Sequence, residues 1–248
     1  MVPAYNEALR IIPTLERIRN YAESNFLSWE IIVMDDGSRD QTASLVKNYF
    51  SASNCRHPMR LLQNPVNRGK GFSVQQGFFA GRGQVILFTD SDLSAPIEEA
   101  GKLIEPIQKG KYDGVIASRA VSGARIVVHQ SFLREYGGKC FNLLVRLLTG
   151  IPFHDTQCGF KAYRRSAFLP VFRQQQLEGF AFDVEVLFIA HRMGLRILET
   201  PILWSHCGDS KVRFIRDALR MLRDIGAIRR NAWKKLYRFT PAEQSTSD

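Results

Sequence analysis

The stretch VILFTDSDLSAP, residues 85–96, joins a run of apolar residues to two closely spaced carboxylates. The apolar part, 85–89, has the length and the composition of a strand buried in a sheet. Asp90 and Asp92 follow it with one serine between them. Because side chains at positions i and i+2 of an extended strand point the same way, we expect the two carboxylates to face a common point.

Two carboxylates that face one point repel each other unless a cation lies between them. A hard divalent ion such as Mg²⁺ or Mn²⁺, held by one or two carboxylates and the phosphates of a substrate, suits this small number of ligands. The alternative for an isolated Asp-Ser-Asp is a solvated turn whose polar side chains cap the next helix.

The rest of the first half repeats the pattern of strand 85–89. Further apolar runs at 29–34, 59–63 and 112–118 alternate with segments of helical pattern at 7–23, 40–51, 70–81 and 97–109. This alternation predicts an α/β fold, Rossmann-like, with a mostly parallel central sheet and helices on both faces. The polar clusters AYNE, DDGSRD, NPVNRGKG and DSDLSAP follow the strands, so we expect them to share the rim where such sheets bind ligands.

Two of these clusters have a structural and a functional interpretation. In VMDDGSRDQT, the side chain of Asp36 can accept hydrogen bonds from a base or ribose, but Asp40 or Ser38 can equally cap the next helix. In NRGKG, Lys70 stands between two glycines at a helix start, where free N–H groups suit an anion. An exposed glycine-rich turn explains the same residues.

Composition excludes several classes of protein. A chain of 248 residues with 45% hydrophobic content can bury one large α/β core. Its four cysteines lie far apart without a CxxC pair, which argues against a zinc module or a disulfide scaffold and favours reduced thiols. No stretch approaches the roughly 20 apolar residues that span a bilayer.

The basic charge is concentrated near the C-terminus. Of a net charge of +10, most comes from residues 211–238, which contain ten Lys and Arg residues against two acidic ones. Apolar residues interleave with them: Phe214, Ile215, Leu219, Met221, Leu222, Ile225, Ile228, Trp233 and Leu236. We expect residues 211–239 to form basic amphipathic helices at an anionic membrane interface. The alternative is a helix packed on the body with a solvated basic face, and no motif accompanies the charge to indicate binding of nucleic acid.

The second half contains a predicted helix at 132–148, a tight segment DTQCGFKAYRR, a predicted helix at 183–193 and a strand at 196–204. Residues 240–248, TPAEQSTSD, are typical of a disordered tail.

Taken together, the motifs resemble those of a known family. VPAYNE, VMDDGSRDQT, NRGKG and FTDSDLSAP, in this order over residues 2–120, resemble the nucleotide-sugar-binding half of family 2 glycosyltransferases, which have the GT-A fold. HDTQCGFKAYRR, GFAFDVEVLFIA and GDSK are similar to enzymes that move a hexose onto polyprenyl (dolichyl) phosphate, and most similar to dolichyl-phosphate β-glucosyltransferases. The mannosyl relatives typically have an arginine where this chain has Ser205.

The resemblance implies a GT-A domain over residues 1–210, with a nucleotide-sugar-binding half, 1–120, and an acceptor half, 121–210. For the donor, it implies that the nucleoside is held by Pro3, Tyr5, Glu7 and Asp36, with Gly69 and Lys70 nearby. It also implies that Asp90 lies at the ribose and metal, that Asp92 binds the metal, and that Arg119 and Lys211 lie at the pyrophosphate. The acceptor phosphate is expected to be bound by Arg134 and Lys161. Ser94 stands where relatives offer a third metal ligand.

The implied reaction is inverting transfer of glucose from UDP-glucose to dolichyl phosphate, with a β-linked product. A phosphate monoester is largely dianionic at neutral pH and needs no general base, so Asp183 is expected to cap the helix 183–193. The alternatives are a GDP-mannose-dependent enzyme and a catalytically silent module that recruits partners to membranes. The expected location is peripheral, on the cytoplasmic face of a membrane. Relatives have more apolar residues before VPAYNE, so either the first strand is short or a segment that can carry an anchor is missing.

Overall fold

The computed structural model describes residues 1–128, 132–206 and 214–239. The strands are β1 (Val2–Ala4), β2 (Ile31–Asp35), β3 (Met59–Gln63), β4 (Val85–Thr89), β5 (Gly114–Ser118), β6 (Arg125–Val128), β7 (Phe160–Arg164), β8 (Ile197–Pro201) and β9 (Leu203–Ser205). The helices are α1 (Ile11–Asn25), α2 (Thr42–Ala52), α3 (Lys70–Ala80), α4 (Ala100–Gln108), α5 (Phe132–Thr149), α6 (Arg165–Gln174), α7 (Phe182–Arg192) and α8 (Phe214–Trp233). A short 3-10 turn, Ile97–Glu99, precedes α4. The predicted α/β alternation is confirmed, whereas β6, β7 and α6 were not expected.

The strands form a mostly parallel sheet with one reversed member. β1, β2 and β3 pair in parallel, and β5 pairs in parallel with β8. β7 lies between β4 and β5 and runs antiparallel to both. The backbone of Met1 joins the two groups of strands, because its N donates to Leu87 O at 2.8 Å and its O accepts from Thr89 N at 3.1 Å. β6 and β9 form a separate parallel pair.

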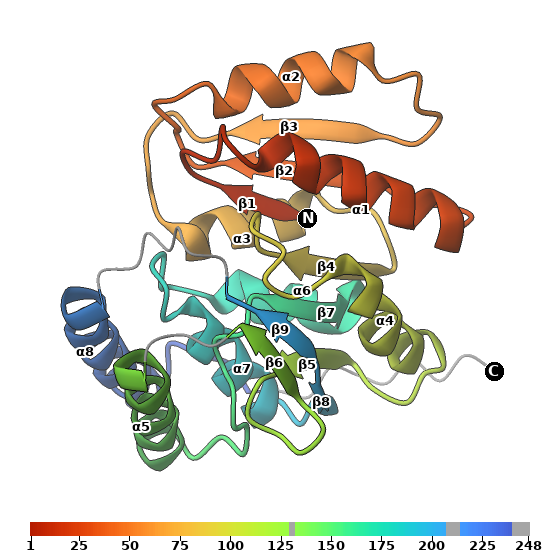
Figure 1. Cartoon of the computed structure of the whole chain (residues 1–248). Coiled ribbons are helices and arrows are strands. Elements are labelled where there is room, and N and C mark those ends of the chain that lie inside the picture. The colour runs from red at the N-terminus through yellow and green to blue at the C-terminus, as the bar shows by residue number, and fades with distance from the viewer. Residues whose placement is uncertain (129–131, 207–213, 240–248) are drawn as a thin grey trace.

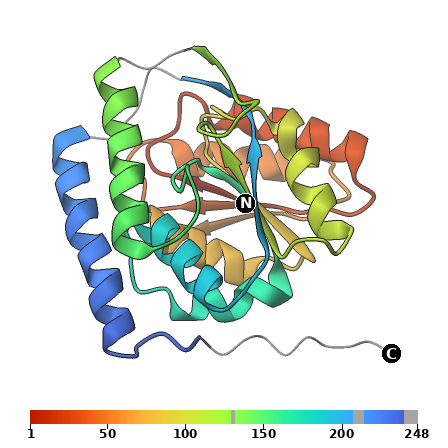
Figure 2. The same ribbon diagram turned by 90° about the horizontal axis from the view of Figure 1, so that it is seen from below.

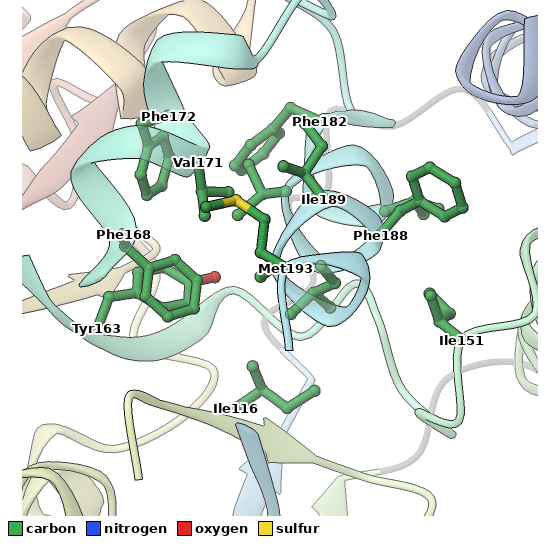
Figure 3. Packing of buried hydrophobic residues seen from close by; sticks show 14 of the residues in the cluster. Ile116, Ile151, Tyr163, Phe168, Val171, Phe172, Phe182, Phe188, Ile189 and Met193 are labelled. Atoms are coloured by element: carbon green, nitrogen blue, oxygen red, sulfur yellow. The ribbon is translucent and has the colours of Figure 1, made fainter. Parts of the chain in front are cut away.

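Helices cover both faces of the sheet (Figure 1). On one face, α1, α2 and α4 pack on alternate side chains of β1, β2 and β5, with Ile11, Leu15 and Leu103 fully buried. On the other, α3, α6 and α7 enclose an aromatic cluster (Figure 3) in which the rings of Phe78 and Phe172 stack with centroids 4.1 Å apart. Alternating side chains on strands between two helix layers are what the continuous apolar runs predict.

The two long helices α5 and α8 lie side by side along one edge of the molecule (Figure 2). On α8, Ile225 and Ile228 are fully buried and join the same hydrophobic cluster as α7, and Met221 is nearly buried. Part of the predicted apolar stripe therefore packs on the body of the protein, as the alternative interpretation proposed. The predicted tail, 240–248, lies outside the described residues.

Candidate functional site

The two predicted metal ligands lie on a turn rather than on a strand. β4 ends at Thr89, and Leu93 N donates to Asp90 O at 3.3 Å, with Leu93 at a φ of 46°. The prediction that Asp90 and Asp92 alternate on an extended strand is therefore wrong. The turn is nevertheless fixed: Thr14 of α1 donates to Ser91 O at 2.7 Å, and Ser94 N donates to an Asp92 carboxylate oxygen at 2.9 Å.

Two neighbouring ion pairs lie on the inner side of this turn, toward the core of the protein. Lys70 Nζ, at the start of α3, is 2.7 Å from Asp90 Oδ1. Lys161 Nζ, on β7, is 2.5 Å from Asp183 Oδ1 on α7 and donates to Cys158 O at 2.7 Å. Both ammonium groups lie over the ring of Phe88, at 5.2 and 5.9 Å from its centroid, as in cation–π contacts.

Burial and the neighbouring charges shift the pKa values of Lys70 and Asp183. Burial acts to lower the pKa of Lys70, but the nearby carboxylates of Asp90, Asp183 and Asp92 outweigh it, so the pKa is raised. Burial raises the pKa of Asp183 even though Lys161 and Lys70 oppose the shift. Shifts with this origin occur where charged groups are gathered in a partly dry site.

Lys161 and Asp183 have roles other than those expected from the sequence. The side chain of Lys161 is 0% exposed, so in this structure its ammonium group faces Asp183 rather than solvent. Asp183 does not cap α7: the helix begins at Phe182 after Ala181, without a side-chain cap. The expected contact of Lys161 with an acceptor phosphate stays a prediction that this arrangement does not support.

Arg119 is held by a partner that the sequence did not reveal. Its guanidinium Nε and Nη2 donate to the two carboxylate oxygens of Asp155 at 2.7 and 2.9 Å, and its backbone N donates to the same carboxylate at 3.0 Å. It also lies 5.4 Å from the ring centroid of Trp204. Burial acts to raise the pKa of Asp155, but Arg119 outweighs it and the pKa is lowered. Arg119 is thus fixed, with 29% of its side chain exposed.

The rim predicted to hold the nucleoside is assembled from the ends of β1 and β2. Asn6, at a φ of 55°, donates from its N to the Ser38 hydroxyl at 2.8 Å, and Glu7 N donates to the Thr42 hydroxyl at 2.7 Å. The first helix begins at Ile11 rather than at residue 7, where the sequence predicts its start. Pro3 lies on β1 and the half-buried Tyr5 follows that strand.

Other residues of this rim have structural partners. Glu7 pairs with Arg10. The carboxylate of Asp36 is buried and accepts from Asn64 Nδ2, Arg68 N and Gly69 N at 2.7 to 3.0 Å. An open depression beside it is lined by Asp35, Gly37, Ser38, Arg39 and residues 63–67. Asp36 therefore shapes the rim by holding the loop 64–69, and its contact with a nucleoside stays a prediction.

The two glycines of NRGKG are required by close packing. A Cβ on Gly69, which has a φ of 112°, would lie 2.5 Å from Glu178 O. A Cβ on Gly71 would lie 2.6 Å from the Cβ of Phe182 and 2.7 Å from Leu177 O. These positions place the backbone of the 177–179 segment directly against the start of α3, so packing alone accounts for both glycines.

Gly159 is a site residue that the sequence analysis missed. Its O accepts from Asp90 N at 3.0 Å, and a Cβ at this position would lie 1.9 Å from Asp90 Oδ2. The absence of a side chain is what leaves room for the Asp90 carboxylate beside Lys70. The only signal in the sequence was the resemblance of the segment around Gly159 to a family motif.

The remaining predicted residues are only partly described. Arg134 lies on α5, but its side chain is outside the described part of the chain, and Lys211 is outside it altogether. Over residues 1–128, 132–206 and 214–239, no three histidine, cysteine, aspartate or glutamate side chains gather to hold a metal ion. Asp90 and Asp92 still fit a magnesium or manganese ion, because such ions take one or two protein carboxylates and complete their shell with phosphates and water.

A family comparison and similar proteins agree with this geometry. A mostly parallel sheet with charged groups at its carboxyl rim is the GT-A arrangement. Residues 1–172 match the model described as Glycosyl transferase family 2, and the chain belongs to this family of glycosyltransferases.

Relatives in sequence come from several eukaryotes. A dolichyl-phosphate beta-glucosyltransferase of Trichomonas vaginalis is 37% identical over 91% of this chain and 68% of its own length. The dolichyl-phosphate beta-glucosyltransferase of Saccharomyces cerevisiae is 33% identical over 96% of this chain and 75% of its own.

Solved structures are similar in fold. The glucosyl-3-phosphoglycerate synthase of Mycobacterium tuberculosis in complex with UDP covers 92% of this chain and 76% of its own, with a TM-score of 0.64 at 22% identity. The same enzyme with Mn²⁺, UDP-glucose and phosphoglyceric acid gives a TM-score of 0.62 at 19% identity, with the same coverage of 92% and 76%. The predicted GT-A fold is confirmed.

Asp155→Asn should destabilise the protein and change its response to acid. Leaving the partly buried Arg119 guanidinium without its carboxylate should cost about 2 kcal/mol of unfolding free energy. The folded pKa of Asp155 is lowered, so its contribution is present above the ordinary carboxyl pKa of about 3.9 and is lost as pH falls through the lowered value. Urea unfolding at several pH values should show a flatter acid limb for the variant.

The control for Asp155→Asn is Glu105→Gln, which removes an exposed ion pair with Lys109 and should leave the curve essentially unchanged. A wild-type acid limb in Asp155→Asn would contradict the assigned role.

Gly159→Ala should displace the Asp90 carboxylate and reduce glycosyl transfer by about a hundredfold, with little effect on the melting temperature. The measurement is transfer rate beside thermal unfolding. Gly138→Ala is the matched control, because a Cβ there has no neighbour within 4 Å in the part of the chain that the structure describes. An active Gly159→Ala variant would show that the position of Asp90 is not critical.

Proposed function

We propose that this chain transfers glucose from UDP-glucose to dolichyl phosphate, with inversion to a β-linked lipid-phosphate sugar. The observation that carries the proposal is its likeness, at 33% to 37% identity over more than nine tenths of its length, to the dolichyl-phosphate beta-glucosyltransferases of yeast and Trichomonas. The turn with Asp90 and Asp92, the fixed Arg119 and Lys70 lie at the rim that such a donor would occupy.

A divalent ion, Mg²⁺ or Mn²⁺, is part of this proposal. Asp90 and Asp92 would hold it, and when bound it would act as a Lewis acid on the diphosphate of the donor. Similar folds that were solved with Mn²⁺ and UDP-glucose support this choice. Arg119 would add a fixed positive charge where the leaving group becomes more negative, a role that Lys211 is also predicted to fill.

The proposed acceptor removes the need for a catalytic base. A phosphate monoester is already a nucleophile near neutral pH, so no side chain has to remove a proton. Asp183, a carboxylate within the motif GFAFDVEVLFIA, is paired with Lys161 in the interior. Asp183 and Lys161 would then stabilise the site from the interior of the protein. Arg134 is the remaining candidate for contact with the acceptor phosphate.

The lipid acceptor requires the protein to work at a membrane, which we propose to be the cytoplasmic face of an anionic bilayer. Within the described ranges, no helix is both long enough and apolar enough to cross a bilayer. The outward face of α8 exposes Arg220, Arg223, Arg229 and Arg230, and Trp233 beyond them is 82% exposed. Neighbouring α5 exposes Leu143 and Leu147, so both helices offer groups suited to a bilayer interface.

GDP-mannose is the alternative donor. Ser205, where mannosyl relatives typically have an arginine, donates from its N to Ser94 O at 2.8 Å. Position 205 thus lies beside the loop that follows Asp92. A serine there favours the glucosyl reaction. The silent-module alternative is disfavoured because the paired charges around Asp90 are intact.

Purified protein given labelled UDP-glucose, dolichyl phosphate and Mn²⁺ should produce a lipid-soluble label, and omitting the metal or adding a chelator should abolish it. GDP-mannose in place of UDP-glucose is the parallel arm. Asp92→Asn should lower turnover by at least about a hundredfold. Label transferred from GDP-mannose alone would replace the glucosyl proposal, and transfer from neither donor would refute both.

The triple variant Arg223→Gln, Arg229→Gln, Arg230→Gln should bind anionic vesicles about a hundredfold more weakly, since each basic residue near such a surface contributes about 1 kcal/mol. Sedimentation with phosphatidylcholine–phosphatidylserine vesicles measures this. Lys47→Gln, Arg56→Gln, Lys111→Gln removes the same charge from exposed positions elsewhere and is the control. Equal losses in the two variants would mean that α8 has no special part in membrane binding.

A further inference from the structure

Glu185 on α7 is a fully buried carboxylate that the proposed reaction does not use. It is 0% exposed. Its Oε1 accepts from the Tyr237 hydroxyl at 2.6 Å. Its Oε2 accepts from the backbone N of Gln176 at 3.0 Å and of Leu177 at 2.8 Å. A buried carboxylate with three donors of this kind fixes whatever those donors belong to, because losing one leaves a charge poorly compensated away from water.

The donors come from two separate parts of the chain. Tyr237 belongs to the segment after α8 and is itself buried, and Asn231 of α8 donates to its hydroxyl at 3.3 Å. Gln176 and Leu177 belong to the loop 175–179, between α6 and α7. Glu185 therefore ties the end of α8 to this loop through one side chain.

The loop 175–179 in turn holds the start of α3. Phe72 N donates to Glu178 O at 3.2 Å, and Gln175 Nε2 donates to Gly71 O at 2.9 Å. As described above, Gly69 and Gly71 both lie against the backbone of this loop. The residue between those two glycines is Lys70, whose ammonium is 2.7 Å from Asp90. The backbone on each side of Lys70 is thus set by the loop.

We infer that Glu185 and Tyr237 are positioning residues of the donor site: they hold the loop 175–179 against α3 and so keep Lys70 beside Asp90. The segment after α8 then contributes to donor binding although it has no part in the donor rim itself. The inference rests on the proposed function only in taking UDP as the nucleotide.

Tyr237→Phe is the sharpest test, because it removes one hydroxyl and keeps the ring packed. The dissociation constant for UDP in the presence of Mn²⁺, measured by calorimetry, should rise about tenfold, the loss expected for one hydrogen bond to a buried charged group. The KM for dolichyl phosphate should stay essentially unchanged. Glu185→Gln should act in the same direction.

Tyr49→Phe is the matched control, since the Tyr49 hydroxyl has no hydrogen-bond partner among the described residues. The UDP affinity of this variant should equal that of the wild type. A merely structural role would lower the melting temperature of Tyr237→Phe without changing UDP affinity, and that result overturns the inference. If the wild type itself fails to bind UDP, the proposed donor is wrong. The positioning role of Glu185 and Tyr237 is then tested by a measurement that needs no nucleotide.

That measurement is hydrogen exchange in the free protein. In Tyr237→Phe, amides in residues 68–73 and 175–179 should exchange faster than in the wild type and in Tyr49→Phe, while those of β2 should not. Unchanged exchange at 68–73 would overturn the inference whatever the donor.

Discussion

The site depends on one constraint of the sheet: β7 runs antiparallel between β4 and β5. The amino end of an antiparallel strand lies at the carboxyl ends of its neighbours. The segment 155–159, which enters β7, therefore arrives beside the turn after β4 and the residue after β5. This is why Asp155 can form an ion pair with Arg119 and why Gly159 lies against Asp90, although these partners are far apart in the chain.

The parts of the fold with a strong hydrophobic pattern could be predicted from the sequence. Strands 59–63 and 85–89 were located to the residue, and α3 nearly so. β7 was missed because its second residue is Lys161, and the hydrophobic pattern gives no reason to bury a lysine. Its charge is compensated by Asp183, a partner 22 residues away, which only tertiary structure reveals.

The candidate site was predicted in location better than in detail. Asp90, Asp92, Lys70 and Arg119 do gather at one rim, but the argument that aligned the two aspartates on a strand failed at the turn after Thr89. Gly69, Asp36 and Lys161 were expected to contact ligands; in this structure they have partners within the protein, and their ligand contacts stay predictions. A short motif shows that certain residue types are needed, yet a glycine that admits a neighbouring carbonyl and one that admits a phosphate look the same in a sequence.

The segment 155–161 also contacts the helices α5 and α8. The Thr156 hydroxyl donates to Asn142 of α5 at 3.1 Å, and Gln157 Nε2 contacts the sulfur of Met221 of α8 at 3.6 Å. A chimera in which α5 and α8 are exchanged for those of a relative with another acceptor would lose both of these contacts. The exchange would have to include the residues leading into β7 for the grafted helices to fit the recipient.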